Sequence, residues 1–264
     1  MNKLLTPFIF LSIAALVGCG GDDSSGGSSG SDENISGNVP DISLPNSSDQ
    51  SSDACFNPDL YKDGIVVRSR HLSKTEGLED SYSIGEYKIE TGQVFGGNKD
   101  LIKQTLYDLD YGGVNSGSSF VENEKFIGHH YLKFDGDYEY FYGTESEYSG
   151  QKTVDILNKP LRVSKIRMAP GETFYPDFHK LYGTPNNNET YEGRELIKTP
   201  VGNYEACKFS VDISATDDTF ENYKVYIWTF AEGPYRGIEA KQAGYINGKV
   251  VSNLDLQEIK LTYK

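Results

Sequence analysis

Apolar and polar residues alternate along the C-terminal third of the chain with the period of two that marks a half-buried β-strand. The clearest run places apolar side chains at every second position, namely Cys207, Phe209, Val211 and Ile213. Residues 223–230 are apolar on both faces, which predicts a central strand. Residues 235–246 and 250–263 read as two further strands joined by Asn247-Gly248, a pair typical of a tight type I′ hairpin turn.

The last of these strands changes parity along its length. Leu254 and Leu256 fall on one face, whereas Ile259 and Leu261 fall on the other if the strand is regular. One extra residue in the strand would return all four side chains to the same face. We therefore expect a β-bulge near Gln257-Glu258.

Short strand-like segments also fill the chain before this region, and Gly, Asn, Asp or Pro separates them every ten residues or so. The predicted strands are 64–72, 82–95, 125–134, 138–142, 154–168 with an interruption near Pro160, and 192–198. Asp135-Gly136-Asp137 has the composition of a hairpin turn. Only residues 99–107 favour a short helix, since Leu101, Ile102 and Leu106 would lie on one side of it.

These patterns predict a mostly β fold with at most one or two short helices. The sheet should be antiparallel and curved into a half-barrel or a closed barrel. Residues 54–264 are enough for one such domain.

The N-terminus differs sharply from this domain. Lys3 is followed by an almost unbroken apolar run of residues 4–17. A membrane-spanning helix needs about 20 apolar residues, so this run is too short to cross a bilayer. Its length is that of the apolar region of a signal peptide, which we place at residues 1–18.

Leu16-Val17-Gly18-Cys19 resembles the lipobox of bacterial lipoproteins. The resemblance implies cleavage after Gly18 and a lipid on Cys19 that anchors the protein to a membrane. Gly20 is not the Asp that retains enteric lipoproteins at the inner membrane, so the resemblance favours the outer membrane, facing the periplasm. The alternative is an ordinary secretory signal with a chance cysteine.

Residues 19–53 are rich in Gly, Ser, Asp and Asn and contain almost no large apolar side chains. Such a segment cannot bury enough surface to offset its loss of conformational entropy. We expect a flexible tether with a root-mean-square reach of roughly 30 Å.

Net charge and cysteine content indicate which partners and which cellular compartment suit the protein. The net charge of −14 argues against nucleic acid and anionic lipid headgroups as partners. Lipidation of Cys19 would leave two of the three cysteines, Cys55 and Cys207. In an oxidising compartment this pair predicts a disulfide, and the alternative is two free buried thiols.

A second resemblance covers residues 190–264. The segment Thr199-Pro200-Val201-Gly202-Asn203-Tyr204-Glu205-Ala206-Cys207 and the later Trp228-Thr229-Phe230-Ala231-Glu232-Gly233-Pro234-Tyr235-Arg236-Gly237 are similar to turns that recur in bacterial envelope families. Some of these families resemble Lol-type lipoprotein carriers, whose concave sheet holds acyl chains. The motifs form turns, so the resemblance bears on the fold and not on an activity.

Recognisable catalytic and metal-binding motifs are absent from the sequence. The four histidines are His71, His129, His130 and His179. His129 and His130 are adjacent on a predicted strand and should point to opposite faces, so we expect no metal site there. We also expect no cofactor.

Two groups of apolar residues are candidates for ligand binding. The first is a cavity in the concave sheet, lined by Phe209, Val211, Trp228 and Phe230. The second is an aromatic loop that either covers a cavity, stacks on a sugar or plugs the barrel end, with Phe174, Tyr175, Phe178 and Tyr182.

The sequence thus favours an envelope lipoprotein that binds an apolar ligand or a protein partner. One alternative is a carbohydrate-active or hydrolytic envelope enzyme that uses dispersed carboxylates. Another is a structural accessory without a ligand.

Overall fold

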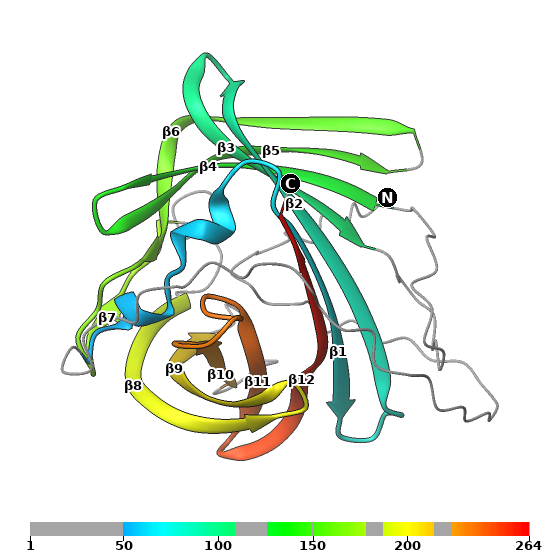
Figure 1. Cartoon of the computed structure of the whole chain (residues 1–264), viewed down its shortest axis with the longest axis vertical. Helices are drawn as coiled ribbons and strands as arrows, with labels where there is room; N and C mark the ends of the chain where they lie inside the picture. The colour runs from blue at the N-terminus through cyan, green and yellow to red at the C-terminus, as the bar shows by residue number, and fades with distance from the viewer. Residues whose placement is uncertain (1–49, 109–125, 149, 178–186, 214–222, 264) are drawn as a thin grey trace.

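A computed structural model describes residues 50–108, 126–148, 150–177, 187–213 and 223–263. These residues form a single antiparallel sheet of 12 strands that curls into a nearly closed barrel (Figure 1). Two 3₁₀ turns precede the first strand, and no helix among the described residues is long and apolar enough to cross a membrane. The predicted fold class is therefore confirmed.

The N-terminal half of the sheet contains β1 (Val66–Thr75), β2 (Ser81–Phe95), β3 (Asn98–Asp108), β4 (Phe126–Asp135), β5 (Tyr138–Tyr148) and β6 (Gln151–Lys165). The C-terminal half contains β7 (Thr173–Phe174), β8 (Asn187–Thr199), β9 (Gly202–Ile213), β10 (Tyr223–Phe230), β11 (Glu239–Ile246) and β12 (Lys249–Thr262).

Each half is a simple meander in which consecutive strands are neighbours. The strand order is β6-β5-β4-β3-β2-β1-β12-β11-β10-β9-β8-β7. The pairing of β1 with β12 is the only contact in this order between strands distant in sequence. The edge strands β6 and β7 do not pair, and the short connection 166–172 joins them along the chain.

The predicted bulge in the last strand is confirmed. Arg70 of β1 lies opposite Glu258, but the next residue, His71, lies opposite Leu256. Gln257 is thus the extra residue. It allows both halves of β12 to turn their apolar side chains toward the same face.

The predicted hairpin turns are also found. Asn247 and Gly248 have φ values of 50° and 79°, as a type I′ turn between β11 and β12 requires. The turn at Gly136, whose φ is 59°, joins β4 to β5.

Residues 99–107 do not form the expected helix, because they belong to β3. This strand is covered on both faces. Leu101 is fully buried in an outer cluster with Phe95 and Tyr131, whereas Leu106 lies on the opposite face, across from Tyr87 of β2. Apolar residues on both sides of a strand produced a pattern that also fits one side of a short helix.

Strand β6 runs through Pro160, but its pairing with β5 is interrupted there, as expected: Phe141 lies opposite Leu161 and Gly143 lies opposite Ile156, which leaves residues 157–160 without partners in β5. The strand lies at the edge of the sheet, where the missing N–H of proline costs no hydrogen bond to a neighbouring strand.

The chain enters the barrel through a segment that we call the N-terminal strap, residues 52–64. It contains the 3₁₀ turns η1 (Ser52–Cys55) and η2 (Pro58–Tyr61). The strap begins beside β9 and ends beside β2, where Gly64 donates a hydrogen bond to the carbonyl of Ile89 at 2.9 Å. Ordered contacts start before residue 54, since Ser52 donates to the carbonyl of Met168 at 3.0 Å.

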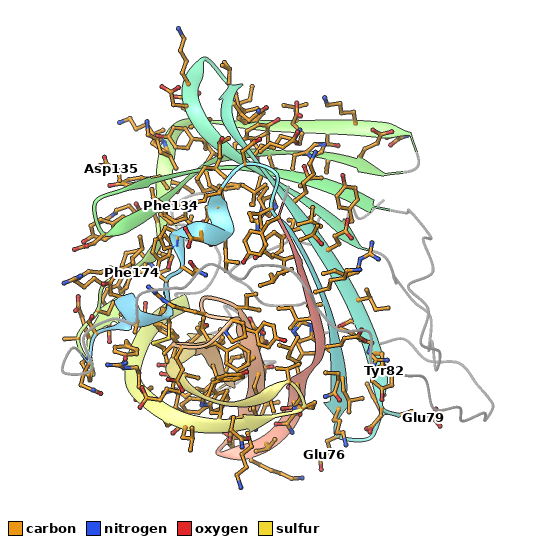
Figure 2. All side chains as sticks on the ribbon, viewed as in Figure 1. Glu76, Glu79, Tyr82, Phe134, Asp135 and Phe174 are labelled. Carbon is orange, nitrogen blue, oxygen red and sulfur yellow. A yellow bond between two sulfur atoms is a disulfide. The ribbon has the colours of Figure 1, made fainter. Side chains whose placement is uncertain are left out.

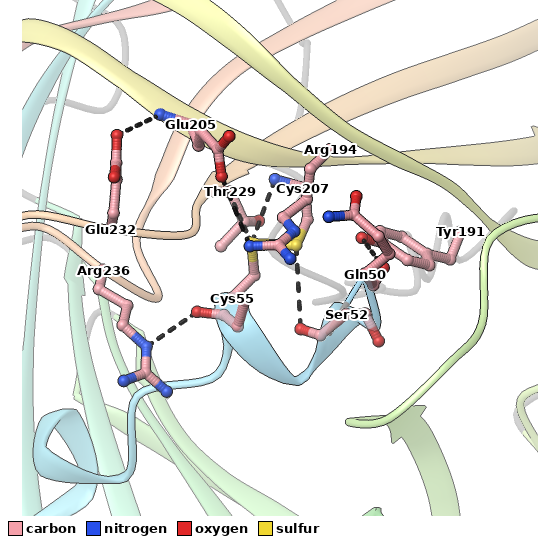
Figure 3. A network of polar contacts seen from close by, with 11 residues as sticks. Gln50, Ser52, Cys55, Tyr191, Arg194, Glu205, Cys207, Thr229, Glu232 and Arg236 are labelled. Carbon is pink, nitrogen blue, oxygen red and sulfur yellow. Dashed lines mark hydrogen bonds and ion pairs between the residues drawn. A yellow bond between two sulfur atoms is a disulfide. The ribbon is translucent and has the colours of Figure 1, made fainter. Parts of the chain in front are cut away.

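A disulfide between Cys55 and Cys207 fixes the strap to β9, as the sequence predicted (Figure 3). Arg236 adds a second attachment, because its guanidinium donates to the carbonyls of Ala54 at 2.8 Å and Phe56 at 2.6 Å. Gly237 is needed beside them: its φ is 86°, and an added Cβ would come within 2.8 Å of Asn57.

The disulfide should be a main source of stability. The two cysteines are 152 residues apart, so the bond greatly restricts the unfolded chain. Replacing both by alanine should lower the free energy of unfolding by about 2–5 kcal/mol. Urea unfolding of the variant and of the oxidised parent measures the difference. Equal stabilities would show that the strap is held without the disulfide.

Candidate binding site inside the barrel

Strand register defines which side chains point into the barrel. In an antiparallel sheet, residues directly opposite each other share a face. The strap packs against the sheet from inside, and its disulfide marks Cys207 as an inner residue. Following the register from Cys207 assigns an inner side chain to each strand, including Phe209, Val211, Ile227, Leu254, Leu256, His71 and Tyr87.

Three carboxyl groups share this inner face. Glu189 of β8 lies opposite Val211, and Glu239 of β11 lies opposite Thr229. Glu139 of β5 lies opposite Phe134 of β4, whose ring packs against the strap. None of the three forms an ion pair with a described residue.

Burial makes these acids hold their protons to unusually high pH. Loss of hydration raises the pKa of Glu239 to about 8, although a hydrogen bond from Gln242 at 2.6 Å opposes the change. It also raises the pKa of Glu139 to about 7. The pKa of Glu189 rises to about 7 through burial and, secondarily, through the nearby charge of Glu139. Uncharged carboxyl groups are therefore abundant inside the barrel at neutral pH.

Two histidines on the inner face are also uncharged. Burial lowers the pKa of His71 to about 4, and a hydrogen bond with the backbone of Glu239 only partly opposes this. Burial, followed by the neighbouring His129, lowers the pKa of His130 to about 4. His129 itself points outward, where its Nδ1 lies 3.0 Å from the hydroxyl of Thr105. The prediction that these adjacent histidines point to opposite faces is confirmed.

Several inner side chains lie deep in the barrel but remain partly accessible to water. The side chains of Glu139, Glu239 and Tyr87 are surrounded by protein, as their raised pKa values reflect, yet each keeps part of its accessible surface. Space that water can enter therefore lies next to these three groups.

Some buried polar atoms on the inner face have no hydrogen-bond partner in the described part of the chain. They are Nε2 of His71, Oε2 of Glu189 and Oε2 of Glu239. Buried polar atoms are normally paired with protein or with an ordered molecule. Unpaired donors and acceptors at this position are what a binding site for a polar group would contain.

The predicted cavity residues separate into two pairs. Phe209 and Val211 point inward, and Val211 packs against Val225 and Ile227. Trp228 and Phe230 point to the opposite face, because they lie across from Lys208 and Ala206. One cavity cannot be lined by all four, since alternate residues of a strand face opposite sides.

The face that carries Trp228 and Phe230 has a different character, and both residues belong to the largest core cluster, with Leu60 of the strap. The indole Nε1 donates to Glu195 at 2.6 Å, and the ammonium groups of Lys208 and Lys241 lie 5.3 and 5.4 Å from its ring. The indole is only 7% exposed, so these contacts shield it from solvent. It is not open to a ligand.

The aromatic loop is described only at its start. Phe174 is buried against Tyr191, and Tyr175 is 60% exposed. Phe178 and Tyr182 lie outside the described residues. Phe174 therefore packs within the fold, and the remainder of the predicted loop site falls on residues outside the described part of the chain.

A separate cavity of about 480 Å³ opens at the seam between β6 and β7, lined by Gln50, Ser51, Asp137, Lys165, Arg167, Ala169, Pro170 and Glu172. Its cations are already paired, Lys165 with Glu172 and Arg167 with Asp53. The described residues contain no group of three side chains suited to hold a metal ion. The inner face of the barrel therefore remains the candidate binding site.

The sequence interpretation missed the inner acids. One signal was available, because Glu139 and Glu189 each stand two positions before an aromatic residue, Phe141 and Tyr191. An acid with the same parity as a buried ring points to the same side of its strand. The sequence alone did not show which side was enclosed.

Comparisons with known proteins find only distant structural similarity. No family model matches the chain, and no curated protein matches it. A solved structure from Bacteroides fragilis, described as an exported protein with a YmcC-like fold, is similar with a TM-score of 0.34 and 11% identity, over 75% of this chain and 96% of that one. Another from Parabacteroides distasonis, described as a lipoprotein, has a TM-score of 0.30 and 12% identity, over 76% and 96%. At these scores the likeness assigns neither a family nor an activity.

Stability should fall as pH rises above about 6.5. A carboxyl with a raised pKa stabilises the folded state fully below its unfolded pKa of 4.5, and this contribution is lost as pH rises through the folded value, about 8 for Glu239. The buried histidines act oppositely, and their contribution is complete only above 6.5. One pKa unit corresponds to about 1.4 kcal/mol, so full ionisation of Glu239 should cost on the order of 3–5 kcal/mol.

Urea unfolding at pH 6.5 and 8.5 measures the part of this loss that falls between the two values, about 2 kcal/mol for Glu239. Glu239→Gln should reduce the difference between the two pH values, because the amide does not ionise. Glu79→Gln, in the exposed turn after β1, is the matched control and should leave the difference unchanged. Equal pH dependence in all three proteins would contradict the assignment to Glu239.

Proposed function

We propose that this protein is a lipid-anchored envelope lipoprotein that binds a small amphipathic ligand on the inner face of its barrel. The observation that carries the binding proposal is the set of unpaired polar atoms on the inner face of the barrel, on His71, Glu189 and Glu239. The observation that carries the anchor is the lipobox-like sequence ending at Cys19.

The chemistry of the inner face suits a ligand with both apolar and polar parts. Val211, Leu256 and Ile259 supply buried apolar surface. Glu239 and His71 add hydrogen-bonding groups that are mainly uncharged at neutral pH. A ligand that fills the apolar part and pairs these groups would relieve the cost of leaving them unpaired.

The tether supports a role near the membrane surface. Residues 19–53 would let the barrel move within roughly 30 Å of an anchor on Cys19. A lipid-linked barrel could then collect or present a ligand close to the bilayer while staying in the aqueous phase.

Native mass spectrometry of the mature chain tests the proposal. Residues 19–264, with Cys19→Ala to prevent lipidation, would be exported through a cleavable signal peptide and purified without detergent. We expect a reproducible added mass that disappears on denaturation, or saturable uptake of the apolar dye N-phenylnaphthylamine. A barrel that carries nothing and takes up no dye would overturn the proposal.

A filled barrel should bind less. Ser83 points inward opposite His71, so Ser83→Trp places a large ring inside. Its neighbour Tyr82 points outward beneath the guanidinium of Arg70, so Tyr82→Trp is the matched control. Dye binding should weaken about tenfold or more in the first variant and stay unchanged in the second. Equal binding in both would place the dye outside the barrel.

Hydrolysis is a second candidate function, favoured by one observation. Glu139 and Glu189 are close enough for the charge of one to raise the pKa of the other. A pair of carboxyl groups is the usual acid and base of carbohydrate hydrolysis. Turnover of a panel of aryl glycosides that is abolished by Glu189→Gln would support it, and no turnover of any substrate would count against it.

A further inference from the structure

Neither Glu139 nor Glu189 on the inner face is paired with a cation of the described residues; Arg194, which shares this face opposite Cys207, pairs with Glu205 at 3.4 Å. Glu139 and Glu189 come from β5 and β8, near opposite edges of the sheet. Phe174 lies directly across from Glu189, its ring lies 6.0 Å from that of Tyr138 beside Glu139, and the charge of Glu139 raises the pKa of Glu189. Lysines of the neighbouring strands point outward, as Lys133 on β4 and Lys208 on β9 show by their register. Neither of the two carboxyls therefore has a positively charged partner in the described part of the chain.

Glu189 is placed to bind a cationic group. It is only 8% exposed, and its Oε2 has no partner among the described residues. Glu139 beside it keeps accessible surface. One acid therefore keeps accessible surface, and the other offers an unused acceptor atom.

Aromatic rings stand next to these acids. Phe134 lies directly across from Glu139 and contacts two rings of the strap, Tyr61 at 4.6 Å and Phe56 at 5.0 Å between centroids. Both contacts are edge-to-face (Figure 2 labels Phe134 beside the strap). The hydroxyl of Tyr61 is close enough to Glu139 for the charge of the carboxylate to raise its pKa.

Carboxylates combined with aromatic rings select for organic cations. Ring faces attract an ammonium group with about 0.5–2 kcal/mol, and more when water is excluded. A metal ion fits less well, because Ca²⁺ requires 6–8 oxygen ligands and the described residues do not gather three ligating side chains.

We propose that Glu139 and Glu189, with the rings of Tyr61 and Phe134, bind the ammonium group of an organic amine whose apolar part occupies the barrel. This inference rests on the proposed function and specifies the polar end of the ligand. Because both carboxyls have a pKa of about 7, arrival of the cation would drive off the protons that they still hold.

Three amphiphiles with the same chain and different head groups test the proposal. Decylamine, decanol and decanoate, each below its micellar concentration, would compete with N-phenylnaphthylamine for the mature chain at pH 7. The ammonium compound should bind about tenfold more tightly than the alcohol, and the carboxylate more weakly than both. Calorimetry in buffers of different ionisation enthalpy should show proton release for decylamine alone.

Conservative variants assign the preference to the acids. The double variant Glu139→Gln/Glu189→Gln should bind decylamine and decanol equally and release no proton. Glu79→Gln removes a charge from a hairpin turn far from Phe134 and should keep the preference (Figure 2). Circular dichroism before titration would confirm that each variant is folded.

The outcomes separate this inference from the proposed function. If the alcohol and the amine bind equally to the parent chain, the barrel binds amphiphiles but the ammonium site is wrong. A preference for the amine that survives the double variant also overturns the site. If the dye and all three amphiphiles fail to bind, the proposed function itself fails.

Discussion

The pairing of β1 with β12 is the constraint on which the rest of this structure depends. Every other strand pair in the described sheet joins strands that follow one another in sequence. Among these strand pairs, only β1 and β12 are distant in sequence, and they pair at the middle of the sheet. Their register, including the bulge at Gln257, determines that Leu254, Leu256, Ile259 and Leu261 all face inward. Without it, two separate meanders would each expose one apolar face.

The strap converts this curved sheet into an enclosed structure. It crosses the inner face from β9 to β2, fastened at one end by the disulfide and at the other by backbone hydrogen bonds with Ile89. Its rings contact Phe134 on the opposite wall. Because the predicted tether leads into this strap, the covalent link at Cys55 would transmit any pull from a membrane anchor to the sheet.

Enclosure gives the inner acids and histidines their chemistry. On an exposed strand the same side chains would have the ordinary pKa values of their residue types. Inside the barrel, loss of hydration raises the pKa of Glu139, Glu189 and Glu239 and lowers that of His71 and His130. The interior is therefore neither a dry apolar cavity nor a charged channel. It combines apolar walls with hydrogen-bonding groups that gain or lose charge near neutral pH.

Local patterns in the sequence determined much of this fold. Alternation located most of the strands, Asn247-Gly248 located a hairpin turn, the parity change located the bulge, and the cysteine count paired Cys55 with Cys207. Strand β3 escaped detection because it is apolar on both faces. The site was decided by tertiary structure alone. Parity shows which residues of one strand share a face, but the curl of the whole sheet decides which face is enclosed and which distant acids meet inside it, as Glu139 and Glu189 do.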